Sequence, residues 1–91
     1  MDLQNIIKSP GTFLVDVRTP GEFEEGSAHG AVNIPLDRVQ VEADQFKGKE
    51  HIVVFCRSGN RSAQAKYVLE KMGFTNVTNG GTWEDVAMMQ E

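Results

Sequence analysis

Two short runs of this sequence are apolar on both faces of an extended chain, and they constrain the fold more than any other feature. They are TFLVDV, from Thr12 to Val17, and HIVVF, from His51 to Phe55. Strands buried in parallel sheets show this pattern, whereas strands with one wet face alternate apolar and polar residues. We therefore expect both runs to be buried parallel strands.

Helical patterns alternate with the strands, which favours an α/β fold with a mainly parallel sheet. One such pattern is the recurrence of Leu36, Val39, Ala43 and Phe46 at helical spacing. The expected elements are helices at 3–9, 20–25, 36–46, 61–72 and from 83 onward, and strands at 12–17, 31–35, 51–55 and 76–78.

Capping and turn residues mark the ends of several elements. Thr19 and Glu22 have the spacing of a capping box, which predicts a short helix after the first strand. Thr82 and Asp85 repeat this spacing before the last helix. Between the last strand and that helix, Asn79-Gly80-Gly81 is typical of a turn.

Length and charge limit the classes of function. The 91 residues predict a single domain, 1–91, with a net charge of −4 and a pI near 5.1. The basic residues are scattered apart from Arg57 and Arg61, so neither nucleic acid nor an anionic membrane is an expected partner. The longest apolar run is too short to cross a bilayer, and the N-terminus lacks a signal-peptide pattern. We expect a cytoplasmic monomer, unless a leader was removed.

Cys56 is the only cysteine, and it directly follows the second apolar run. One thiol cannot form an internal disulfide, and it excludes a zinc site built from several cysteines. On its own, a free cysteine is most often a small buried hydrophobe. Here Arg57 and Arg61 both lie within five residues of the thiol, and two cations so close favour a reactive cysteine.

The residues that follow the thiol are small or turn-forming. Ser58, Gly59 and Asn60 stand there, and glycine adopts a positive φ without strain. A tight turn that leads into a helix directs backbone N–H groups inward, and such a concavity binds anions. These donors and nearby arginines lower the pKa of a thiol, so we predict that Cys56 is a nucleophile. The two arginines would attract an anionic substrate.

This loop, CRSGNRS at residues 56–62, resembles the active-site loop of rhodanese-type sulfurtransferases. The resemblance covers most of the chain, because other motifs of that family follow in the same order. They are Asp16-Val17-Arg18, Glu22-Phe23, the segment from Gly26 to Pro35 that ends in GAVNIP, and Gly80-Gly81-Thr82-Trp83. One motif departs: the family's Gly-His-Ile reads Gly26-Ser27-Ala28 here, and the nearby His29 is expected to be an ordinary surface or half-buried histidine.

The resemblance implies a three-layer α/β/α domain around a central, mainly parallel sheet of four to five short strands. It implies that Cys56 takes a sulfur atom from thiosulfate or a similar small anionic donor and carries it as a persulfide. The sulfur then passes to cyanide or, in a cell, to a thiol or an acceptor protein. Neither a metal nor an organic cofactor is needed. The substrate-binding residues would be those whose N–H groups line the loop: Arg57, Ser58, Gly59, Asn60, Arg61 and Ser62.

Three residues outside the loop are candidates for support. Asp16 and Arg18 lie just past the end of the first strand, where they could support the cysteine loop. For Arg18 we favour a structural ion pair with Glu22. Trp83 follows two glycines, and it is expected either to wall the pocket or to pack in the core.

Two other functions are compatible with this loop. A cysteine-dependent phosphatase or arsenate reductase on the same fold would resemble C-x5-R, but only four residues separate Cys56 from Arg61. The shorter loop suits a single sulfur atom better than a tetrahedral oxyanion, and the chain has no second thiol to resolve an arsenate reductase cycle. A non-catalytic interaction module of the same family is the other alternative, although the cysteine and both arginines are present.

Overall fold

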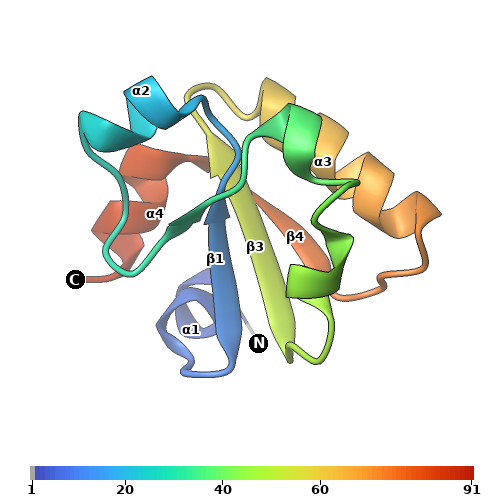
Figure 1. Ribbon diagram of the computed structural model, residues 1–91. Helices are drawn as coiled ribbons and strands as arrows, with labels where there is room; N and C mark the ends of the chain where they lie inside the picture. The colour runs from blue at the N-terminus through green and yellow to red at the C-terminus, as the bar shows by residue number, and fades with distance from the viewer. Residues whose placement is uncertain (1) are drawn as a thin grey trace.

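The computed structural model describes residues 2–91, and its centre is one parallel sheet. The strands lie in the order β2-β1-β3-β4 (Figure 1). Their bounds are Thr12–Asp16 for β1, Val32–Asn33 for β2, His51–Cys56 for β3 and Val77–Thr82 for β4. The two apolar runs of the sequence are the central neighbours β1 and β3, with Val15 paired to Val54. The prediction of a parallel α/β fold is confirmed.

Helices cover both faces of this sheet (Figure 1). The elements are α1 (Leu3–Lys8), α2 (Pro20–Glu24), α3 (Asn60–Lys71), α4 (Trp83–Met89) and two 3₁₀ helices, η1 (Leu36–Arg38) and η2 (Ala43–Phe46). Successive side chains of β3 explain the two covers, because Val54 packs with α3, η2 and their neighbours while Val53 packs with α1 and α4. The domain therefore has three layers, as the resemblance implied. Within residues 2–91, no helix is long and apolar enough to span a membrane.

The segment 36–46 differs from the continuous helix that its spacing predicted. It forms η1 and η2 with turns between them, and Val39 N–H bonds back to Leu36 O in the tighter 3₁₀ manner. The β-branched Val39 and Val41 disfavour a regular α-helix. Val39 and Phe46 are nevertheless almost fully buried, so the apolar pattern identified the buried side correctly and the hydrogen bonding wrongly.

The predicted turn at Asn79-Gly80-Gly81 is also wrong, because β4 continues through it to Thr82. The register moves from Val54↔Asn79 to Phe55↔Gly81, so Gly80 is an extra residue in a bulge. Glycine is required there because a Cβ on Gly80 would lie 2.8 Å from the side chain of Val53 and 2.9 Å from that of Val86. The glycines kink the strand instead of ending it.

The predicted helix caps are present. The Thr19 hydroxyl accepts a hydrogen bond from Glu22 N–H, and a Glu22 carboxylate oxygen accepts one from Thr19 N–H, which completes the capping box of α2. The Thr82 hydroxyl accepts from Asp85 N–H at the start of α4. These caps fix the helix that leaves β1 and the helix that leaves β4, both of which border the site.

Candidate active site

Cys56 is the last residue of β3, and it lies at the carboxyl end of the central strand with no exposed surface. Its sulfur accepts a hydrogen bond of 3.0 Å from Gly59 N–H. The hydroxyl of Ser62, in the first turn of α3, lies 3.4 Å from the same sulfur. The chain between strand and helix therefore folds back on the thiol, as the spacing of the loop predicted.

Gly59 makes this turn possible. It is the N-cap of α3 and has a φ of 93°, a left-handed conformation that side chains other than glycine rarely adopt. In that conformation its N–H points at Cys56 Sγ while its carbonyl starts the helix through a hydrogen bond from Ala63 N–H. The remaining loop residues Ser58 and Asn60 are exposed, and Asn60 N–H bonds to the Ser58 hydroxyl at 3.5 Å.

The pKa of the Cys56 thiol lies below its ordinary value. Burial raises this pKa, but hydrogen bonds from the Ser62 side chain and from the backbone of Ser62, Ser58 and Gly59 lower it, and their combined effect is larger. The residue is thus both of the things that the sequence left open: a fully buried thiol, and one placed among donors that stabilise its thiolate.

Arg61 is held by Glu22. Two guanidinium nitrogens donate to the two oxygens of Glu22, at 2.6 and 3.0 Å, across 39 residues of sequence. This hydrogen-bonded pair lowers the pKa of Glu22 to about 2. The positive charge of Arg61 is therefore already neutralised by the Glu22 carboxylate before a substrate binds. The expected ion pair between Arg18 and Glu22 is wrong, because Glu22 faces Arg61 instead.

Arg18 pairs with Asp16 in the interior. Its guanidinium donates to Asp16 at 2.7 and 3.0 Å and to Gly26 O at 2.6 Å, and only 5% of the Arg18 surface is exposed. The hydrogen bond to Asp16 raises the pKa of Arg18 further above its ordinary value. The pair forms because both side chains leave the end of β1 on the same side, two residues apart. It joins the loop at 26–27 to the central strand.

Two residues that the sequence analysis did not single out complete this buried network. Ser27 donates its hydroxyl proton to Asp16 Oδ2 at 2.7 Å. Asn33, in β2, donates to the backbone carbonyls of Asp16 and Arg18 at 3.0 and 2.9 Å. The sequence did point to Ser27 and Asn33, because both lie within the motif at residues 26–35. Their hydrogen-bond partners could not be predicted, because those depend on tertiary packing.

A cavity of about 380 Å³ opens beside the loop. Arg57 and Trp83 line it, together with the carboxylates Glu22, Glu25 and Glu84. Trp83 is half-buried, and its ring lies 5.1 Å from the Arg18 guanidinium carbon, so it both walls this cavity and covers the buried pair. Arg57 is exposed, and in the described part of the chain it has no ion-pair partner.

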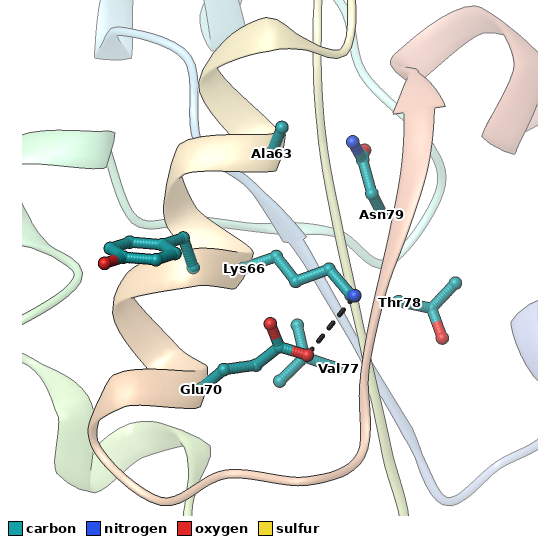
Figure 2. A pocket seen from close by; sticks show the side chains of 7 residues that line it. Ala63, Lys66, Glu70, Val77, Thr78 and Asn79 are labelled. Carbon is teal, nitrogen blue, oxygen red and sulfur yellow. Dashed lines mark ion pairs between the residues drawn. The ribbon is translucent and has the colours of Figure 1, made fainter.

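A second groove, of about 590 Å³, runs between α3 and β4 (Figure 2). Lys66 and Glu70 face it as an ion pair of 3.3 Å, and Asn79 lies at its end near the start of α3. Cys56 does not line this groove. Across residues 2–91 there is also no group of three or more histidine, cysteine or carboxylate side chains placed to hold a metal ion.

The comparison with protein-family models matches residues 1–82 to the rhodanese-like domain. The chain belongs to the rhodanese-like domain family. The match includes the β3–loop–α3 unit that holds Cys56. The fold and family of the chain are therefore those that the sequence motifs indicated.

Known members of the family are similar along most of this rhodanese-like chain. Thiosulfate sulfurtransferase PspE of Escherichia coli is 41% identical over 76 residues, which cover 81% of this chain and 73% of PspE. A sulfurtransferase of Allochromatium vinosum is 32% identical over 76 residues, covering 84% and 71%. A solved structure described as rhodanese with anions from E. coli superposes with a TM-score of 0.77 at 35% identity, covering 84% of this chain and 92% of that one. The enzyme class, a rhodanese-type sulfurtransferase, is thereby established.

The residues at the departure from the family motif are placed differently in this rhodanese-like domain. Ser27 stands where the motif has histidine, and its hydroxyl donates to the buried Asp16. His29 lies on the surface, where its backbone is bound by Gln90. Ser27 therefore helps to satisfy the buried carboxylate, and His29 does not contact it.

Proposed function

We propose that this sulfurtransferase takes the outer sulfur of thiosulfate onto Cys56 and passes it to a second thiol or to cyanide. One observation supports this most directly: the sulfur of a single cysteine accepts the N–H of Gly59 at 3.0 Å inside a four-residue turn at the start of a helix. An anionic sulfur at this place is stabilised by the same donors before and after the transfer.

The first half-reaction forms one bond and breaks one. The Cys56 thiolate attacks the outer sulfur of thiosulfate, and a new S–S bond forms between them. The S–S bond within thiosulfate breaks, and its electron pair leaves with sulfite. Cys56 then carries a persulfide anion whose negative charge lies on the terminal sulfur, within reach of the loop N–H groups. No electrons are gained or lost overall.

The second half-reaction returns the enzyme to its starting state. A thiolate or cyanide attacks the terminal sulfur, and the persulfide S–S bond breaks. The electron pair returns to Cys56, and the product is a persulfide of the acceptor or thiocyanate. Both half-reactions use the same loop donors, so one site serves donor and acceptor in turn.

Arg57 is the group best placed to receive the donor. It is exposed, lines the cavity next to the loop and has no carboxylate partner within residues 2–91, whereas Arg61 is held by Glu22. Thiosulfate as the donor is further supported by the name of the E. coli relative. Because Cys56 has no exposed surface, the donor sulfur reaches it when the exposed loop residues Arg57, Ser58 and Asn60 shift aside.

Phosphate chemistry fits this loop less well. A loop that surrounds a tetrahedral oxyanion needs room and a free arginine at its end. Here the turn closes with Gly59 N–H already on the sulfur, and both Arg61 nitrogens that donate to Glu22 would have to leave it. We therefore rank sulfur transfer above phosphate-ester hydrolysis.

The test is the mass of the intact protein after incubation with thiosulfate. We expect the wild type to gain the mass of one sulfur atom and to lose it again when cyanide is added, with release of thiocyanate. Cys56→Ala should gain nothing. Faster cleavage of an aryl phosphate than of thiosulfate would overturn the proposal in favour of a phosphatase, and no gain in mass from any sulfane donor would indicate an interaction module.

A further inference from the structure

A chain of hydrogen bonds leads from Cys56 to Asn79 behind the loop. The Ser62 hydroxyl, which lies 3.4 Å from Cys56 Sγ, donates its proton to Asn79 Oδ1 at 2.7 Å. Ser62 is fully buried, so water does not compete for this hydroxyl. Asn79 lies on β4 at the same level as Ala63 of α3, with its amide directed toward the start of that helix (Figure 2).

Backbone groups fix the orientation of the Asn79 amide. Gly81 N–H donates to Oδ1 at 2.9 Å, and Nδ2 donates to Gly59 O at 3.1 Å. A reversed amide would place a donor against the N–H and an acceptor against the carbonyl. The oxygen of Asn79 therefore has to face Ser62. The same side chain also holds the Gly59 residue whose N–H binds the thiol.

The direction of one proton follows from this arrangement. The Ser62 hydroxyl has a single proton, and while Asn79 accepts it the oxygen can only accept from Cys56. A neutral thiol supplies a proton for that contact, whereas a thiolate does not. To donate to the thiolate, Ser62 has to turn its proton away from Asn79. Asn79 thus competes with the Cys56 sulfur for one hydroxyl proton.

We propose that Asn79 is a positioning residue for Cys56, which competes with the sulfur for the Ser62 proton and holds the Gly59 peptide at the sulfur. While Ser62 donates to Asn79, only backbone N–H groups stabilise the thiolate, and the Ser62 hydroxyl adds to them when it turns toward the sulfur. The inference rests on the proposed function only in that Cys56 is taken as the nucleophile.

The Asn79 contacts give opposite expectations for two substitutions. Asn79→Ala removes the acceptor and frees the Ser62 proton for the sulfur, so the pKa of Cys56 should fall by about half to one unit, the size of one hydrogen bond. Asn79→Asp keeps the shape and the acceptor for Ser62, loses the donor to Gly59 O and adds a negative charge, so the same pKa should rise. A purely structural role would loosen the loop in both variants and shift both in one direction.

The measurement is the rate of alkylation by iodoacetamide as a function of pH, which reports Cys56 alone because the chain has one cysteine. Ser62→Ala and the double variant Ser62→Ala/Asn79→Ala complete a thermodynamic cycle. We expect the Asn79→Ala shift to disappear once Ser62 is absent. Thr78→Ala, at the neighbouring position in the same groove, is the matched control and should leave the profile unchanged.

Shifts of Asn79→Ala and Asn79→Asp in the same direction would overturn the inference, as would an undiminished Asn79→Ala shift in the Ser62→Ala background. Asn79→Leu, which has nearly the volume of asparagine and no acceptor, replaces the alanine variant if the latter folds poorly. Alkylation needs neither a sulfur donor nor an acceptor. Its outcome is therefore independent of whether thiosulfate leaves a persulfide on Cys56.

Discussion

Two arginine–carboxylate pairs flank the cysteine loop, and they differ in nearly every physical respect. Arg18 and Asp16 are two residues apart and almost completely buried, with 5% and 0% of their side chains exposed. Arg61 and Glu22 are joined across 39 residues and remain about one-third exposed, at 33% and 28%. Both pairs have short contacts, of 2.7 and 2.6 Å, so distance alone does not separate them.

The difference lies in what each pair would leave behind if it were broken. Removing one partner of a buried pair leaves a charge in a medium that cannot solvate it, whereas water replaces the lost partner of a half-exposed pair. The interior pair therefore acts mainly on the stability of the fold. The surface pair acts mainly on the charge that the loop presents to a substrate. Substitutions at each pair test this division.

The largest effect is expected from Arg18→Met. This change keeps most of the side-chain volume but leaves Asp16 buried without its cation and Gly26 O without its donor. We expect a loss of about 3–5 kcal/mol in the free energy of unfolding, measured by urea denaturation.

The matched control is Arg38→Met, the same substitution in an exposed pair with Glu42 at 3.3 Å. Its expected cost is below about 1 kcal/mol. Equal losses in the two variants would show that burial does not distinguish the pairs, and the division between stability and substrate charge would then be wrong.

The partners in these pairs mark the limit of prediction from this sequence. Arg18 was expected to form a structural ion pair with Glu22. In the structure Arg18 pairs with Asp16, because both side chains leave β1 on one side. Glu22 pairs with Arg61, which lies in a helix distant in the sequence. Local spacing cannot choose between partners that only the packed fold brings together.

The fold and the turn around Cys56 were predictable for the opposite reason, since their signals are local. The doubly apolar runs specified β1 and β3, and the lone cysteine followed by Gly59 specified the turn at the start of α3. Asn79 was missed because Asn-Gly-Gly has the composition of a turn. Its position in a bulged strand, from which it reaches Ser62, depends on the pairing of β4 with β3.

A smaller effect, and one that depends on pH, is expected from Glu22→Gln. Glutamine retains the capping-box acceptor for Thr19 N–H but not the charge that holds Arg61. The pKa of Glu22 is lowered from 4.5 to about 2 in the folded state, so its pairing stabilises the protein fully above the unfolded value and this stabilisation disappears as the pH falls from about 4.5 to about 2. Wild type should therefore be the more stable protein at pH 7, and the difference in stability should shrink as the pH falls below about 4.5 and vanish near pH 2.

Urea denaturation of both proteins at several values between neutral pH and pH 3 measures this difference. Lys47→Gln, which breaks an exposed pair between Lys47 and Asp44 away from the site, provides the comparison for an ion pair on the surface. A difference between wild type and Glu22→Gln that stays constant down to pH 3 would mean that the carboxylate contributes through its shape and not through its charge.

The smallest effect is expected from a carboxylate that belongs to neither pair. Glu84 lines the cavity beside Arg57, is exposed, and has no ion-pair partner within residues 2–91. Its charge repels an anionic donor but is partly screened by salt. Glu84→Gln should therefore raise kcat/KM for thiosulfate about twofold at low ionic strength, and the gain should shrink as salt is added.

Asp85→Asn removes the same charge one residue further along α4, from a side chain outside the cavity lining, and should change kcat/KM less. Equal gains in both variants would mean that only the net charge of the domain matters to the donor. A gain confined to Glu84→Gln would locate the approach of thiosulfate at this cavity, which Arg57 lines.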